Sequence, residues 1–169
     1  LYYQRHAIDL APPWPQMTVK DAFDRFVSVP MDRALAEGRF DDVMGCDIEP
    51  RLGWDRPVFL YDYPAPHGAA FARLKPDHPE VAERFELYIG GMELCNGFSE
   101  LRGADAYRFR FDQEIQGGGR SRPIPERFLH DMEEMPSSAG NALGVDRLVM
   151  LFCDTDQIDD VVTFTPEAL

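Results

Sequence analysis

Two stretches of the chain combine residue types that can bind a metal-bound triphosphate and an amine. The first runs from Gly90 to Leu101 and places Glu93, Asn96 and Glu100 beside glycines. Two carboxylates can bridge a hard cation such as Mg²⁺, and a carboxylate with a carboxamide can receive an ammonium group. We therefore expect Mg²⁺ and a diamino acid here. In the plainer alternative, both glutamates are solvated strand residues.

The second stretch consists of small residues from 139 to 144 followed by Asp146 and Arg147. A strand with so little side-chain bulk leaves room for a planar ring such as adenine against its backbone. Arg147 offers a planar, permanently charged fork that suits phosphate oxygens, and we expect Asp146 to orient it. The alternative is a tight helix–sheet contact with Arg147 in an ordinary surface ion pair.

A β-hairpin is expected to hold the first stretch. Apolar and polar residues alternate from residue 83 onwards, and Gly90-Gly91 suits a tight two-residue turn. The alternation predicts that Phe85 and Leu87 face the core, whereas Glu86 and Tyr88 lie on an open face where a ligand could bind.

Glu93 and Glu100 are separated by an odd number of residues, which would put their side chains on opposite faces of an unbroken strand. A shared site therefore requires a break in the strand. Gly97 is the residue best able to absorb one, so we predict irregular backbone at Asn96-Gly97.

The remaining pattern predicts one α+β domain. The first residues look like the end of a helix, and the chain has no initial Met. The spacing of apolar residues and the positions of Gly and Pro predict helices over residues 18–27, 30–38, 104–116, 125–135 and 145–152. They also predict strands over 57–64 and 138–144, a loop over 65–79, and a helix-to-strand segment over 158–164.

Composition excludes several classes of protein. Seventeen basic against thirty acidic residues give a net charge of −13, which disfavours a broad grip on nucleic acid phosphates. Cys46, Cys95 and Cys153 are widely spaced, which argues against a disulfide framework or structural zinc and favours the cytoplasm. No apolar run approaches the ~20 residues that span a bilayer.

The segments Val81–Glu86, Glu93–Leu101 and Ala142–Leu151 resemble the catalytic domain of class II lysyl-tRNA synthetases and of the short ligases that modify elongation factor P. The resemblance implies an α+β fold with an antiparallel sheet flanked by helices. Residues 1–169 would form the C-terminal part of that class II core, with the hairpin at 83–101 and the family's motif 3 at 139–152.

For the nucleotide, the resemblance implies that Glu93 and Leu94 contact ATP and its Mg²⁺, and that Gly144 and Arg147 bind the nucleotide. Glu100 would also reach the metal. Glu93 and Arg147 are thus the expected catalytic residues.

For the amino acid, the resemblance implies that Asn96, Glu100 and Ala142 line a pocket for lysine or β-lysine. The short ligases have alanine where lysyl-tRNA synthetases have glycine at the position of Ala142, and the loop Tyr63–Pro66 also resembles the short ligases. Both features favour β-lysine, although a single methyl group discriminates by only ~1–3 kcal/mol.

The implied reaction is activation of the substrate as an aminoacyl-adenylate, followed by transfer to a lysine of elongation factor P. A lysyl-tRNA synthetase fragment acting on tRNA and a non-catalytic nucleotide- or amino-acid-binding half-domain are the alternatives. Motifs 1 and 2 of the family are not found, so the polypeptide alone is expected to be inactive, as a truncated piece, a proteolytic piece or a natural half-domain. The complete protein is expected to be a homodimer.

Overall fold

The computed structural model describes residues 1–65, 71–116 and 123–165. These form two compact units: residues 1–62, 85–96 and 141–169 make the first, and residues 63–84 and 97–140 the second. The predicted loop over 65–79 lies partly outside the described residues, as do the glycines expected to end the helix at 116.

The strands of the structure largely follow the predicted pattern. A short hairpin, β1 (Tyr2–Tyr3) and β2 (His6–Ala7), opens the chain, and a five-stranded sheet follows in the order β3-β4-β5-β6-β7. The bounds are β3 Gln16–Thr18, β4 Val58–Tyr61, β5 Arg84–Ile89, β6 Met92–Ser99 and β7 Ala139–Leu143.

The helices and shorter helical turns complete the architecture. They are α1 Val19–Phe26, α2 Met31–Ala36, α3 Phe40–Val43, the π-helix η1 Met44–Ile48, the 3₁₀ turn η2 Glu49–Arg51, α5 Ala104–Gln116, α6 Glu126–Glu133, α7 Val145–Cys153 and the 3₁₀ turn η3 Ile158–Asp160.

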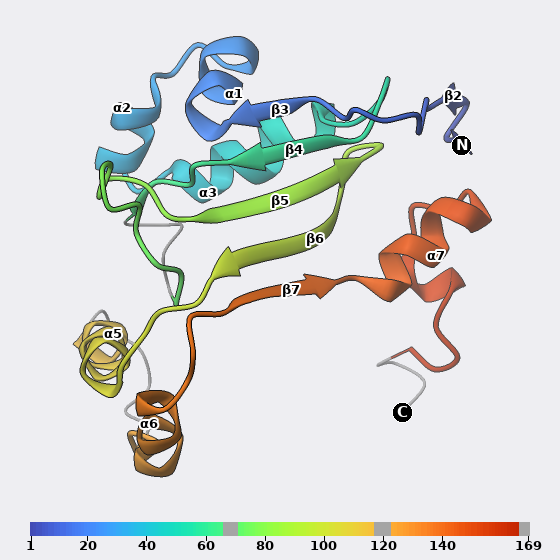
Figure 1. Cartoon of the computed structure of the whole chain (residues 1–169). Helices are drawn as coiled ribbons and strands as arrows, with labels where there is room; N and C mark the ends of the chain where they lie inside the picture. The colour runs from blue at the N-terminus through green and yellow to red at the C-terminus, as the bar shows by residue number, and fades with distance from the viewer. Residues whose placement is uncertain (66–70, 117–122, 166–169) are drawn as a thin grey trace. The chain divides into compact units, whose positions relative to one another are not determined.

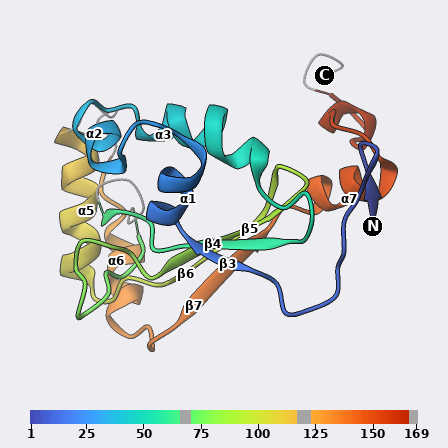
Figure 2. The same cartoon turned by 90° about the horizontal axis from the view of Figure 1, so that it is seen from above.

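The fold is α+β, as expected, but its sheet is mixed rather than wholly antiparallel. β4 pairs antiparallel with β5, whereas β3 pairs parallel with β4. Parallel neighbours need a long crossover, and α1, α2 and α3 supply it between them. Seen along the edge of the sheet, these helices lie on one side of β3, β4 and β5 (Figure 2).

The sequence explains why α1 begins where it does. The Thr18 side chain accepts a hydrogen bond from the Asp21 backbone N–H (3.0 Å), which satisfies one of the unpaired donors of the first turn. Val19, Ala22 and Phe23 then bury one face of the helix, and the Phe23 ring stacks on Phe40 at 5.5 Å. This face anchors the helical layer to the core.

The predicted hairpin at residues 83–101 is confirmed as β5 and β6 (Figure 1). Gly90 and Gly91 have φ of 59° and 76°, which a two-residue turn of the favoured hand requires. A side chain at Gly90 would also collide with the Tyr3 ring, which lies 2.7 Å from the Cβ position. The turn is thus locked against the first residues of the chain.

Two predictions at the ends of the chain are wrong. The opening residues form the β1–β2 hairpin and not a helix end, because Gln4 and Arg5 both take positive φ in a tight turn. Near the other end, η3 is followed by turns and bends up to residue 165, so the strand expected before residue 164 is absent from the described residues.

Candidate active site

The structure brings the two chemical stretches together through one ion pair. Nη1 of Arg147, in the first turn of α7, donates to the Glu93 carbonyl oxygen (2.8 Å) and to Glu93 Oε2 (3.1 Å) on β6. The two residues are 54 positions apart in the sequence. Their side chains are 47% and 29% exposed, so the pair lies at an accessible surface. Asp146 was expected to orient Arg147; in the described residues the guanidinium is held by Glu93, and a role for Asp146 stays a prediction.

The anchoring of Arg147 leaves most of its fork available. A guanidinium has N–H groups on Nε, Nη1 and Nη2, and Glu93 occupies Nη1. The Arg147 stem passes over Gly144, where a Cβ would lie 3.4 Å from Arg147 Cδ. The small residue at 144 therefore gives the arginine a flat backbone to lie on, and Nε and Nη2 can face an anion.

Gly144 and Leu94 connect β6 to the start of α7. The Gly144 backbone N–H donates to the Leu94 carbonyl oxygen (2.8 Å), and Gly144 is the N-cap residue of α7. The Leu94 side chain is 3% exposed and packs in a core cluster with Ile89 and Leu151. A nucleotide contact from Leu94 would therefore come from its main chain, while the side chain holds the strand in place.

Asn96 belongs to a buried polar network in the first unit. Glu86 Oε1 accepts from Asn96 Nδ2 (3.3 Å), and Glu86 Oε2 accepts from the Tyr88 hydroxyl (2.5 Å). Glu86 is 5% exposed and Tyr88 is fully buried. The expectation that these two residues lie on an open face is wrong, since their side chains satisfy one another in the interior.

Glu49, at the start of η2, joins this network. Burial raises the pKa of Glu49, the neighbouring Glu86 and Glu93 raise it further, and a hydrogen bond with Tyr88 and the charge of Arg147 lower it. Three carboxylates, Glu49, Glu86 and Glu93, therefore lie near one another in the first unit. The sequence had indicated only Glu93 as a site carboxylate in this unit. Counting across the two-residue Gly90-Gly91 turn places Glu86 opposite Cys95, so spacing alone points neither to the bond between Glu86 and Asn96 nor to Glu49.

Glu100 is held within the second unit. Its backbone N–H donates to the Ser138 carbonyl oxygen (3.0 Å), and its side chain is hydrogen-bonded to Tyr107, which is 3% exposed. The carboxylate also lies over Gly140, because a Cβ at that position would be 2.7 Å from Glu100 Oε1. Tyr107 and Gly140 fix the carboxylate, and the sequence indicated neither role.

The irregular backbone predicted at Asn96-Gly97 is not placed at these two residues and stays a prediction. β6 is continuous from Met92 to Ser99, and Gly97 does not take a positive φ. The Ser99 backbone N–H donates to the Glu83 carbonyl oxygen (2.9 Å), one residue out of the register that the Gly90-Gly91 turn sets, so β6 contains one extra residue, as in a β-bulge. Glu93 and Glu100 belong to different units, so a metal site shared by the two remains a prediction.

The small-residue strand is confirmed, and it is exposed. β7 ends one residue before Gly144, and Ala142 is exposed on it. A groove of about 640 Å³ lies beside Arg147 in the first unit, lined also by Trp54, Gly91, Met92 and Met150. Its volume is within the range of small-molecule sites.

The described residues contain neither a preformed metal cluster nor a membrane-spanning helix. Among residues 1–65, 71–116 and 123–165, no three His, Cys, Asp or Glu side chains are arranged to hold a metal ion. Every helix in this described part is too short or too polar to cross a bilayer.

Comparison with known proteins places the chain in a family. The sequence model of the class II tRNA synthetases (D, K and N) matches residues 2–168. The chain is 43% identical over 122 residues to elongation factor P–(R)-β-lysine ligases of Haemophilus influenzae strain PittGG and Proteus mirabilis, covering 69% of this chain and 38% and 37% of those proteins. The enzyme of that name from Erwinia tasmaniensis is 44% identical over 70% of this chain and 38% of its own length. The chain thus matches less than half the length of these relatives, and it belongs to the class II tRNA synthetase family.

Proposed function

We propose that this chain carries the ATP- and amino-acid-binding part of a ligase that activates lysine or β-lysine and transfers it to a lysine of elongation factor P. The single observation that supports this best is the Arg147–Glu93 pair, which joins the acidic hairpin to the helix that follows the small-residue strand. The names of the relatives support the substrate and the acceptor.

Arg147 is the residue proposed to hold the nucleotide. Its Nη1 is fixed by Glu93, so Nε and Nη2 can form paired hydrogen bonds with phosphate oxygens. A positioned cation of this kind stabilises the charge that develops on the phosphates while the substrate carboxylate attacks.

The carboxylates of the first unit fit a magnesium ion that arrives with ATP. Such an ion is commonly held by one or two carboxylates together with phosphates and water, so a closed protein cage is not required. Glu93 is accessible beside the acidic neighbours Glu49 and Glu86 and is the proposed ligand, with Glu100 as the second. When bound, the ion would neutralise phosphate charge.

Asn96 and Glu100 are proposed to receive the amino groups of the substrate. Asn96 Nδ2 donates to Glu86, and the oxygen of a carboxamide is the kind of acceptor that an ammonium group needs. The Glu100 carboxylate, held by Tyr107 and resting on Gly140, can accept from another. Ala142 is the proposed determinant of β-lysine over lysine.

The transfer step needs no protein nucleophile. The amine of the acceptor lysine attacks the activated carbonyl, the bond to AMP breaks, and the amine loses a proton, so positioning provides most of the catalysis. Lysine-dependent pyrophosphate exchange in the complete protein, compared between lysine and β-lysine, tests activation. Transfer of labelled substrate to elongation factor P, with tRNA in a parallel reaction, tests the acceptor. Exchange with neither amino acid would refute the proposal, and transfer to tRNA alone would favour a lysyl-tRNA synthetase.

A further inference from the structure

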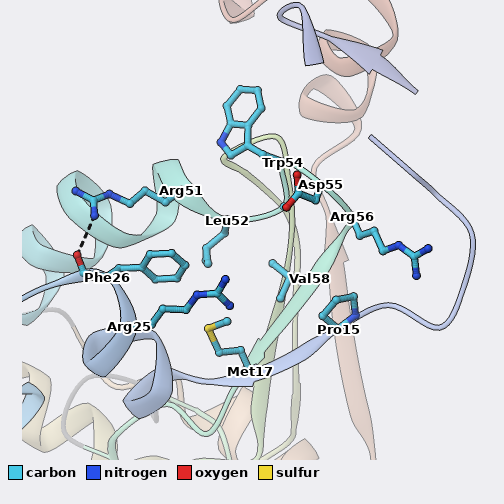
Figure 3. Close-up of a pocket in the computed structure, with 11 residues that line it drawn as sticks. Pro15, Met17, Arg25, Phe26, Arg51, Leu52, Trp54, Asp55, Arg56 and Val58 are labelled. Carbon is cyan, nitrogen blue, oxygen red and sulfur yellow. Dashed lines mark hydrogen bonds between the residues drawn. The ribbon is translucent and has the colours of Figure 1, made fainter. Parts of the chain in front are cut away.

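A second groove lies between the end of α1 and the turn that precedes β4, in the first unit. Its volume is about 240 Å³. Its floor is apolar and includes Met17, Phe26, Leu52 and Val58 (Figure 3). The Arg25 guanidinium points into the space between Phe26, Leu52 and Val58.

Two of the three arginines that line this groove have no carboxylate partner in the part of the chain that the structure describes. Within the described residues, neither Arg25 nor Arg51 forms an ion pair with a carboxylate. Arg25 lies over the Phe26 ring, 5.2 Å from its centroid, and Arg51 Nη1 donates to the Phe26 carbonyl oxygen (2.9 Å). Arg56, by contrast, pairs with Asp9. Asp55 is the one acid among the lining residues, so arginine predominates in the groove.

The groove is positive although the chain has a net charge of −13. Two guanidinium groups beside an apolar floor complement a ligand that carries a carboxylate next to an apolar group. The volume is below the ~300 Å³ at which small-molecule sites begin, and it suits one or two side chains of a protein. Arginine and tryptophan are also the residues most often found at the energetic centre of protein interfaces.

Trp54 connects this groove to the candidate site. It lines both this groove and the larger groove beside Arg147. A protein held at Arg25 would therefore lie next to the groove that contains the catalytic arginine. An acceptor protein has to occupy such a position, because its lysine must reach the activated substrate.

We propose that the Arg25 groove docks the acceptor protein through a segment in which an acidic side chain neighbours an apolar one. This inference rests on the proposed function for the identity of the acceptor. The carboxylate would pair with Arg25, and the apolar side chain would pack on Met17, Leu52 and Val58. Arg51 has a structural role as well, since its hydrogen bond caps the last turn of α1.

The test compares Arg25→Glu with the unaltered complete protein in binding to elongation factor P. Arg25 makes no hydrogen bond that its replacement would break among the described residues, so the fold should persist, and thermal unfolding checks this. We expect the Kd to rise by about tenfold, and Arg25→Lys to retain most of the affinity. Arg33→Glu, in which an exposed arginine of α2 is reversed, is the matched control and should leave the Kd unchanged.

Pyrophosphate exchange in the same variants separates this inference from the proposed function. Exchange should be the same in Arg25→Glu as in the unaltered protein. An unchanged Kd, or an equal loss of exchange and binding, would overturn the docking site. Loss of self-association in Arg25→Glu, measured by sedimentation, would assign the groove to a second copy of the chain and would also overturn it. Binding that depends on Arg25 without any exchange would instead refute the proposed function alone.

Discussion

Replacing Arg147 with alanine should reduce nucleotide activation far more than it reduces stability. The Arg147–Glu93 ion pair is half exposed, and exposed pairs contribute about 0.2–1 kcal/mol. The hydrogen bond to the Glu93 carbonyl adds about 1 kcal/mol. The free energy of unfolding should therefore fall by only about 1–2 kcal/mol. A positioned donor on a developing charge is worth ~10²–10³-fold in kcat, so exchange should fall by about that factor.

The assay measures pyrophosphate exchange and chemical denaturation on the complete protein. Arg108→Ala is the matched control, because Arg108 forms a bidentate pair with Glu126 on the α5–α6 surface and has no proposed role. It should match the stability loss and leave exchange unchanged. Glu93→Gln should keep Arg147 anchored through the main-chain carbonyl, so it tests the charge of Glu93 separately. Exchange in Arg147→Ala within about threefold of the unaltered protein would refute the reasoning.

Three further predictions concern neighbouring positions. Gly140→Ala should push the Glu100 carboxylate aside and raise the KM for the amino acid by roughly tenfold. Gly45→Ala is the control, because the space around its Cβ is open, and it should leave the KM unchanged. Equal KM values in the two variants would contradict the role of Glu100. Ala142→Gly should raise the use of lysine relative to β-lysine by less than about a hundredfold, and an unchanged ratio of kcat/KM would remove Ala142 as the determinant. The raised pKa of Glu49 means that the folded chain holds this proton more tightly than the unfolded chain. The free energy of unfolding should therefore fall as the pH rises from the usual glutamate pKa to the raised value, and equal slopes in Glu49→Gln and the unaltered protein would contradict the burial.

Local signals in the sequence were sufficient for most elements because the physics that sets them is local. The Thr18 cap, the Gly90-Gly91 turn and the spacing of apolar residues in α7 each act within a few positions, and each prediction is confirmed. The parallel pairing of β3 with β4 depends on a crossover of about forty residues, and nothing in the composition of β3 specifies it.

The site was only partly predictable from the sequence, because contacts between residues far apart in the chain create it. Glu93 and Arg147 could be selected by residue type, but the ion pair between them is a tertiary contact across 54 positions. The alternation rule placed Glu86 on an open face because it assumes that polar residues prefer water. In the folded chain, Tyr88 and Asn96 satisfy the Glu86 carboxylate, and that outweighs the cost of burial.

The buried Glu86 carboxylate also determines how the Asn96 side chain is oriented in the candidate site. The Glu86 carboxylate oxygens accept hydrogen bonds, so Asn96 turns its amide nitrogen towards Glu86. On the same strand, Glu93 binds one nitrogen of Arg147 and leaves the rest of the fork outward. The first unit therefore presents an acceptor suited to cations and a donor suited to anions. A diamino acid has ammonium groups for the acceptor and a carboxylate that must approach an anionic phosphate, which is feasible only where a fixed cation such as Arg147 offsets the repulsion.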